Sequence, residues 1–218
     1  MAKDELINKF NYIGTRPNRP DGLDKVTGRA KYGADFNAPN MLHAAVLRSP
    51  HAHARIIKID TSKAEALSGV KAFVTRADFP TGLKGEDFYL QENTIAGDRV
   101  LYDGHAVAAV AATSALAAKD AIKLIEVEYE ILPHVTDVDE AMRPDAPVIR
   151  KGAQDHTVPE GSPPNIVSYM DFGHGDLETG FSDADLIMEN TYKTEAAHQG
   201  YIEPHACVGQ LGQDGKGE

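Results

Sequence analysis

The sequence contains no tryptophan and only one cysteine, Cys207, among its 218 residues. One thiol cannot form an intrachain disulfide, and it cannot supply the several cysteines of an iron–sulfur cluster or a cysteine-based zinc site. This cysteine content is typical of a reducing compartment. Because aromatic residues make up only 7% of the chain, Ala, Val, Leu and Ile have to fill the core.

Positive charge is also scarce, since 22 Lys and Arg face 33 Asp and Glu and the net charge is −11. Long-range electrostatics therefore oppose binding to nucleic acid or to an anionic membrane surface. No apolar run approaches the roughly 20 residues that span a bilayer. The N-terminal residues Met1–Leu6 are too charged for the apolar core of a signal peptide. We expect a cytoplasmic protein with no membrane and no nucleic-acid partner.

The remaining composition is that of a globular α+β protein, with 42% hydrophobic and 25% charged residues. Ser62 and Glu65 have the spacing of a capping box and predict the start of a short helix. The run Val100–Ala112 favours a buried strand, although its many alanines leave a helix open. Thr113 is placed to cap a helix that reaches about Ile125. Alternating apolar residues predict strands at 42–48, 54–59, 70–75 and 127–131, and residues 76–90 are expected to form a loop.

The second half of the chain is more irregular in sequence. Prolines and glycines in 144–164 indicate a linker. Beyond it we expect strands at 166–172 and 184–193, with a short helix at 176–181. Residues 207–211 resemble one arm of a hairpin and 213–217 its turn, so a returning strand should follow. We therefore expect the sequence to be interrupted at Glu218.

His51, His53 and Arg55 would share one face of a strand. Two imidazoles can bind zinc or copper, but a closed site needs three or four ligands, and Arg55 would repel a cation. A structural role is therefore favoured over a metal site. The sequence Asp103-Gly104-His105 is likewise more typical of a turn than of a catalytic carboxylate–histidine pair.

The segment from His198 to His205 places hydrogen-bonding side chains around a small residue and a proline. It fits a loop that approaches a polar ligand, and it fits an ordinary turn between strands equally well. The residues alone leave these two interpretations open.

Several phrases resemble the large subunit of the xanthine dehydrogenase/aldehyde oxidase family, the molybdenum hydroxylases. They occur in the order expected for that family over nearly all of the chain from about Ile13 to Leu211. The phrases are KVTGRAKYGAD at 25–35, MLHAAVLRSPHAHAR at 41–55, VKAFVT at 70–75, DRVLYDGHAVAAV at 98–110, IEVEYEILP at 125–133 and YIEPH at 201–205.

This resemblance implies an irregular N-terminal segment (1–21), an a/b hammerhead domain (22–143), a linker (144–164) and the incomplete start of a molybdopterin-binding domain (165–218). It also implies an oxidoreductase that oxidises a heterocycle, an aldehyde or a related carbon centre with oxygen from water. The cofactor would be molybdopterin, and iron–sulfur clusters and FAD would lie on partner subunits or domains.

The site residues that the resemblance implies are few. The loop before Tyr201 is similar to the segment that approaches the molybdenum centre, which makes His198, Gln199 and Glu203 candidate neighbours of the cofactor. Ala197 stands where the family often has glutamine. The family's catalytic glutamate lies beyond Glu218, so no catalytic residue and no metal ligand is assigned in this span.

Two other functions stay open. One is a non-catalytic split subunit that docks a separate molybdopterin-binding chain, because an open strand at 207–211 invites pairing with another polypeptide. The other is an independent metal-binding domain that uses His51 and His53.

Overall fold

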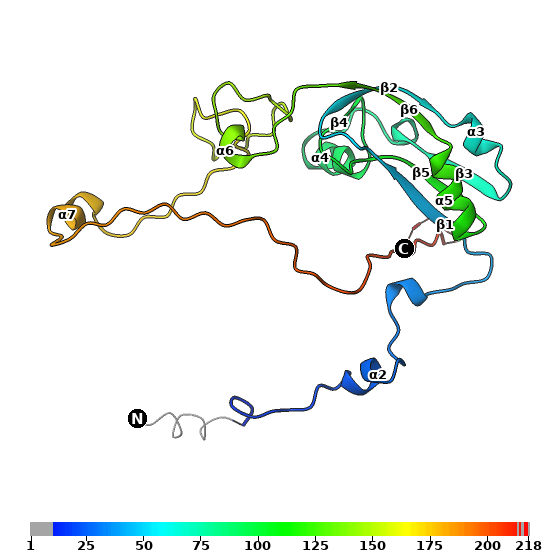
Figure 1. Cartoon of the computed structure of the whole chain (residues 1–218), viewed down its shortest axis with the longest axis horizontal. Helices are drawn as coiled ribbons and strands as arrows, with labels where there is room; N and C mark the ends of the chain where they lie inside the picture. The colour runs from blue at the N-terminus through cyan, green and yellow to red at the C-terminus, as the bar shows by residue number, and fades with distance from the viewer. Residues whose placement is uncertain (1–10, 213, 215, 218) are drawn as a thin grey trace. The chain divides into compact units, whose positions relative to one another are not determined.

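The computed structural model describes residues 11–212, 214, 216 and 217. The chain divides into two compact units. One combines the described residues up to Pro39 with those from Asn190 onward, and the other spans Asn40–Glu189. The first unit contains α2 (Gly22–Val26) and the short 3-10 helix Gly33–Asp35. The second unit contains all of the strands named here (Figure 1).

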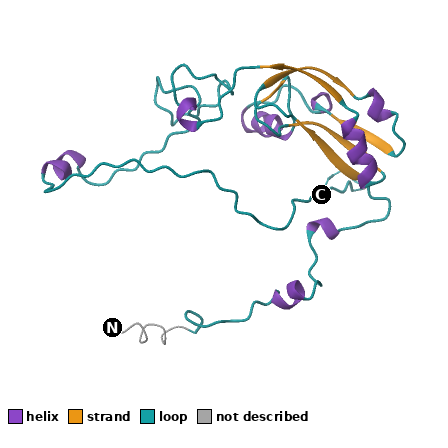
Figure 2. Ribbon diagram, in the orientation of Figure 1, coloured by secondary structure: helices purple, strands orange, loops and turns teal. Residues whose placement is uncertain are grey.

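Two three-stranded antiparallel sheets form the framework of the second unit (Figure 2). The first has the strand order β1-β5-β3 and the second the order β4-β2-β6. Their bounds are β1 (His43–Arg48), β2 (Ala54–Asp60), β3 (Val70–Val74), β4 (Arg99–Val100), β5 (Ala106–Ala112) and β6 (Glu126–Ile131). The α+β class and the strands expected in 42–131 are confirmed, and the apolar run at 100–112 contains a strand rather than a helix.

The helix α5 (Ala115–Lys123) packs against β1 and β5. Ala118 and Ala121 are buried in this contact, together with Ile125 just beyond the helix. The expected cap was one residue too early, because the side chain of Ser114, not that of Thr113, accepts the hydrogen bond from the backbone N–H of Ala117. Ser114 has the extended backbone of an N-cap, which directs its hydroxyl toward the first helical turn.

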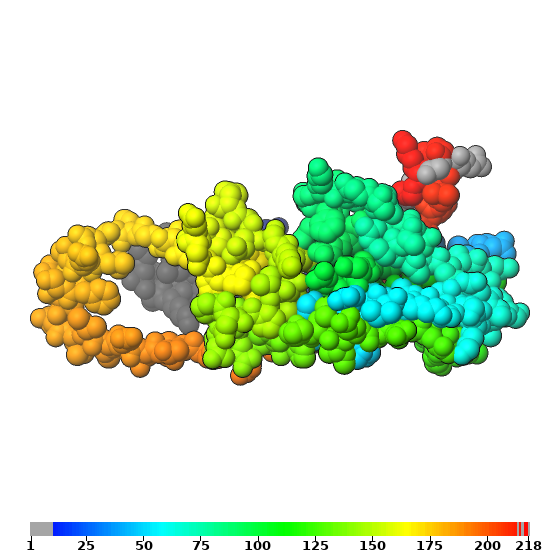
Figure 3. Space-filling model, turned by 90° about the horizontal axis from the view of Figure 1, so that it is seen from above, coloured from blue at the N-terminus to red at the C-terminus, as the bar shows by residue number. Residues whose placement is uncertain are grey.

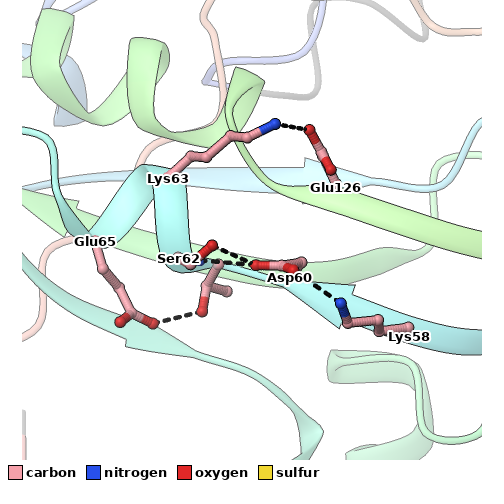
Figure 4. Close-up of polar contacts among 7 residues, drawn as sticks. Lys58, Asp60, Ser62, Lys63, Glu65 and Glu126 are labelled. Carbon is pink, nitrogen blue, oxygen red and sulfur yellow. Dashed lines mark hydrogen bonds and ion pairs between the residues drawn. The ribbon is translucent and has the colours of Figure 1, made fainter.

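The short helix α3 (Ser62–Glu65) is present, but the capping box predicted for it is wrong. Thr61 is the N-cap, and its hydroxyl donates to the Glu65 carboxylate. Ser62 instead donates to Asp60 through its backbone N–H and its hydroxyl, as Figure 4 shows. The bond from the Ser62 hydroxyl, then the bond from Lys58 and the backbone bond from Ser62, hold the pKa of Asp60 well below its usual range. Figure 4 also shows Lys63 paired with Glu126 of β6.

The expected loop at 76–90 is wrong in part, because it contains the 3-10 helix Arg76–Asp78 and the first residues of α4 (Gly85–Thr94). Gln91 is the only buried residue of α4, so the helix carries almost no apolar stripe for a sequence pattern to detect. The Gln91 amide donates to the Pro80 carbonyl at 3.0 Å.

Arg150 attaches the segment after β6 to α4. Its guanidinium pairs with the Glu92 carboxylate at 3.0 Å and donates to the side chain of Asn93 at 2.9 Å. It also lies over the ring of Tyr89, 4.7 Å from the centroid. The remaining short helices of this unit are α6 (Val138–Ala141) and α7 (Leu177–Ser182).

The strands predicted at 166–172 and 184–193 are wrong, because the structure has no strand in either range. The helix between them is present as α7, with Asp176 as its N-cap. Figure 3 shows the orange segment around α7 as an open loop that is one chain thick. Every described residue from Val167 onward is exposed, and an extended segment without a partner cannot form a sheet ladder.

The expected hairpin arm at 207–211 is reduced to one isolated bridge between Leu211 and Gly217. Gln213 and Gly215 of the predicted turn lie outside the described residues, as does Glu218. Across the described part of the chain, no helix combines the length and the apolar character needed to cross a membrane.

His105 is fully buried at the turn that enters β5. Its Nδ1 accepts from the Leu101 backbone N–H at 3.2 Å, so its Nε2 carries the proton and donates to the Glu92 carbonyl at 2.8 Å. Burial lowers the pKa of His105 below its usual 6.5. Gly104 has φ of 82°, which confirms the predicted turn. The ring of His105 therefore joins β5 to the last turn of α4 as a neutral group.

We expect His105→Ala to lower the free energy of unfolding by about 3 kcal/mol, because it leaves a buried donor and a buried acceptor unpaired. Exposed His134 provides the matched control, and His134→Ala should change the free energy by less than about 0.5 kcal/mol. Urea unfolding at pH 7.5 measures both. Equal stabilities of the two variants would contradict the role assigned to His105.

The contribution of His105 should also depend on pH. Its pKa is lower in the folded state than in the unfolded state, so its stabilisation is complete above about 6.5 and is lost as the pH falls below that value. The difference in unfolding free energy between the wild type and His105→Ala should therefore narrow from pH 7.5 to pH 5.5. A difference that stays constant or widens would show that the folded protein accepts the charged ring.

Candidate functional site

The loop His198–His205 belongs to the first unit and turns at Gly200. Gly200 has φ of 68°, in the left-handed region that glycine adopts without strain. Its backbone N–H donates to Nδ1 of His198 at 3.0 Å. The turn therefore fixes the His198 ring beside the residues that follow it.

Tyr201 lies between two histidines. The centroid of its ring is 5.1 Å from that of His198 and 5.0 Å from that of His205. The Tyr201 hydroxyl is also hydrogen-bonded to Nε2 of His205. The three rings form an exposed group that combines a flat apolar surface with polar edges.

Glu203 connects this loop to a segment far away in the sequence. Its Oε1 accepts from the backbone N–H of Gly33 at 3.4 Å, across 170 positions. A Cβ placed on Gly33 would lie 3.3 Å from the Cβ of Ala206, so glycine permits this close approach. Two of the phrases that carry the family resemblance, at 25–35 and 201–205, thus meet here. Sequence reasoning did not find this contact.

The predicted cofactor residues are brought together only in part. His198 and Glu203 lie on the same short loop, and Gln199 is exposed between His198 and the turn at Gly200. The loop borders a shallow hollow of about 360 Å³. This hollow is lined by Tyr201, Glu203, Pro204, His205 and Ala206. The arrangement offers imidazole, carboxylate and phenol groups to a polar molecule, from one side only.

The histidines His51 and His53 each contact residues at the edge of the second sheet. Both lie in the bend before β2 rather than in a strand. His53 is buried, and its Nδ1 is 2.7 Å from the Pro133 carbonyl oxygen. His51 makes an edge-to-face contact with Tyr129. Arg55, the third residue of the cluster, pairs with Glu130 of β6 at 3.3 Å, so its expected position on one strand face with the histidines is wrong.

A second cavity, of about 380 Å³, lies in the second unit between α4 and β4. Arg76, Phe88, Glu92 and Arg99 are among its lining residues. The Glu92 carboxylate is already paired with Arg150, and Arg76 donates to the Pro80 carbonyl at 3.3 Å. Within the described residues, no group of three or more His, Cys, Asp or Glu could hold a metal ion.

The contact between Gly33 and Ala206 can be trapped chemically. In a Cys207→Ser background, Gly33→Cys with Ala206→Cys should form a disulfide under mild oxidation, because the two Cβ atoms would be 3.3 Å apart, close to the usual separation. The matched control is Gly28→Cys with Ala206→Cys, since Gly28 has no neighbour within 4 Å of its Cβ position. Intact mass after thiol labelling distinguishes the two. Equal cross-linking in both variants would refute the contact.

Comparison with known proteins identifies the family. The sequence model described as "Aldehyde oxidase and xanthine dehydrogenase, a/b hammerhead domain" matches residues 27–133. The model described as "Molybdopterin cofactor-binding domain" matches residues 158–218. Together they cover most of the chain in the order that the sequence phrases predicted.

Three relatives agree with these matches. A probable xanthine dehydrogenase subunit from Bacillus subtilis is 37% identical over 96% of this chain and 26% of its own length. The nicotinate dehydrogenase large molybdopterin subunit from Eubacterium barkeri is 32% identical over 99% of this chain and 47% of its own length. The solved structure of reconstituted CO dehydrogenase from Oligotropha carboxidovorans superposes with a TM-score of 0.53 and 36% identity, over 68% of this chain and 19% of the other.

The chain thus spans only about a quarter of the Bacillus relative and about half of the Eubacterium relative. The matches nevertheless extend from the hammerhead strands to the last described residues, and they confirm the resemblance that the sequence phrases carried. The chain belongs to the aldehyde oxidase and xanthine dehydrogenase family.

Proposed function

We propose that this chain forms the N-terminal part of the large subunit of a molybdenum-dependent hydroxylase or dehydrogenase. The observation that carries the proposal is the order of the two matched domains, a hammerhead at 27–133 and a molybdopterin-binding segment at 158–218. The complete protein would oxidise a heterocycle, an aldehyde or a related carbon centre with oxygen from water. It would work in the cytoplasm.

In this proposal the domains are an irregular N-terminal segment (1–21), the hammerhead (22–143), a linker (144–164) and the start of the molybdopterin-binding domain (165–218). The linker is supported by the absence of helix and strand in its range and by the exposed Pro144 and Pro159. Within the linker, Arg150 pairs with Glu92 and donates to Asn93, so this part of the linker is attached to α4.

His198, Gln199 and Glu203 are the residues proposed to lie beside the cofactor. They fit a pterin in their chemistry, because a pterin is recognised by amide, imidazole and carboxylate groups that satisfy its ring nitrogens and oxygens. When bound, the molybdenum–pterin centre supplies the oxidation chemistry. The loop would orient this centre from one side. The family often has a glutamine at the position of Ala197, and Gln199 would take the role of that glutamine in this chain.

The proposed partners are the remainder of a molybdopterin-binding polypeptide and the subunits or domains that carry iron–sulfur clusters and FAD. The single cysteine supports this division, because clusters need several thiolates and must therefore lie elsewhere. Exposed apolar side chains in the segment after the linker also favour a covering polypeptide. They include Met170, Phe172, Tyr192 and Ile202, which are between 77% and 99% exposed.

One observation favours a second candidate, a non-catalytic split subunit that docks a separate molybdopterin-binding chain. The same stretch of sequence covers 47% of the Eubacterium relative but only 26% of the Bacillus one, so chains of very different length carry it. In this alternative the exposed segment from Val167 onward would complete its domain with residues of another chain.

Residues 1–218 alone should not retain the cofactor, because a loop exposed on one side cannot bury most of a pterin. We expect purified 1–218 to contain no stoichiometric molybdenum by elemental mass spectrometry. The sample should come from cells that load the cofactor into a co-expressed full-length relative as a positive control. Stoichiometric molybdenum in 1–218 would overturn the proposal that the site needs further polypeptide.

Gln199→Ala in the natively assembled protein should weaken cofactor retention by roughly tenfold, as is typical when a residue that orients a metal centre is removed. Gln210→Ala is the matched control, because it removes the same amide from another exposed position of the same unit. Molybdenum and pterin content after dialysis are the readouts. Equal retention in both variants would remove Gln199 from the site.

A further inference from the structure

The outer face of the β1-β5-β3 sheet is made only of alanine and valine at its centre. Its strand register places Val46, Ala109 and Val74 in one row across the three strands. The adjacent row consists of Ala44, Ala111 and Ala72. Val46 and Val74 are 39% and 37% exposed, and Ala44 and Ala72 are also exposed. We call these six residues the alanine–valine face.

The opposite face of this sheet is already buried. Ala108 and Val110 of β5 pack there with Ala64 of α3 and with Ala121 and Ile125 of the α5 region. Every position of β5 is apolar, and Ala109 and Ala111 on the other side of the sheet are only partly buried. Continuous apolar strands of this kind are typical of sheets that are buried on both faces.

The other sheet of the same unit shows what a solvent-facing surface looks like in this protein. Its strand β6 alternates, with Glu126, Glu128 and Glu130 exposed. Arg55 and Lys58 of β2 lie opposite two of these carboxylates. The chain thus places charged pairs where this sheet meets water. The six residues of the alanine–valine face carry no charge, and the exposed charges of their sheet, Arg48 and Lys71, lie outside the face.

We propose that the alanine–valine face is the surface on which the rest of the molybdopterin-binding polypeptide docks. This inference rests on the proposed function. Small side chains allow another backbone to approach closely, and the absence of charge requires an apolar partner surface. The chain spans only 26% and 19% of two of the proteins that it matches, so most of such a protein lies outside these 218 residues and is available to cover the face.

Photo-cross-linking in the natively assembled protein tests this directly. Val74 is replaced by p-benzoylphenylalanine in one sample, and Ile57, an exposed apolar residue on β2 of the other sheet, is replaced in the control. After irradiation, cross-linked peptides are identified by mass spectrometry, and molybdenum is measured in the same samples. We expect position 74 to cross-link to molybdopterin-binding sequence outside residues 1–218, and position 57 not to do so.

The docking proposal would be refuted if position 74 cross-linked to a second copy of residues 1–218 or to an iron–sulfur or flavin polypeptide. It would also be refuted if position 74 gave no cross-link. Molybdenum in that sample would show that the proposed function still stands, whereas an assembly without molybdenum would show that the function itself is wrong.

A pair of charge variants gives an independent result. Val46→Lys with Val74→Lys should reduce the molybdenum that co-purifies by roughly tenfold or more, because docking would bury two unpaired charges. Ile57→Lys should leave it unchanged. Thermal unfolding of the purified chains checks that both variants fold. Equal molybdenum in two folded variants would refute the proposal.

Discussion

The composition of β5 is the constraint on which the hammerhead unit depends. Its seven residues are all alanine or valine, and it is the central strand of its sheet. Small side chains let α5 approach through Ala118 and Ala121, and they let the second sheet pack against Val107. At the entrance to the strand, the neutral ring of His105 ties it to α4. A larger or charged residue on the inner side of β5 would separate these layers.

The sequence predicted the strands and α5 well because their signals are local. The alternation in 127–131 reflects one buried and one exposed face of β6, and the spacing of Ala118, Ile122 and Ile125 reflects one face of α5. Choosing Thr113 over Ser114 as the cap failed because both residues carry a suitable hydroxyl and only the backbone angles decide between them. Helix α4 was missed because it buries Gln91 in place of an apolar stripe.

The remaining differences arise from contacts between distant residues. Strands were expected at 166–172 and 184–193 from their composition, but a strand exists only when its backbone groups find a partner. The polar residues at 198–205 were recognised as a cluster. The contact of this loop with Gly33 was not predicted, because the two segments lie 170 positions apart and no local residue pattern indicates it. The family resemblance identified the family and the order of its domains, because it depends on the order of phrases rather than on local propensity.

The central claim is that this chain contributes a hammerhead and the first part of a cofactor domain to a molybdenum enzyme. The most direct test is the intact mass of the natively expressed protein, with metal analysis of the same sample. We expect residues 1–218 to occur in a molybdenum-containing assembly, either within a larger chain or beside a molybdopterin-binding partner. A native protein of 218 residues, without a partner chain and without molybdenum, would contradict it.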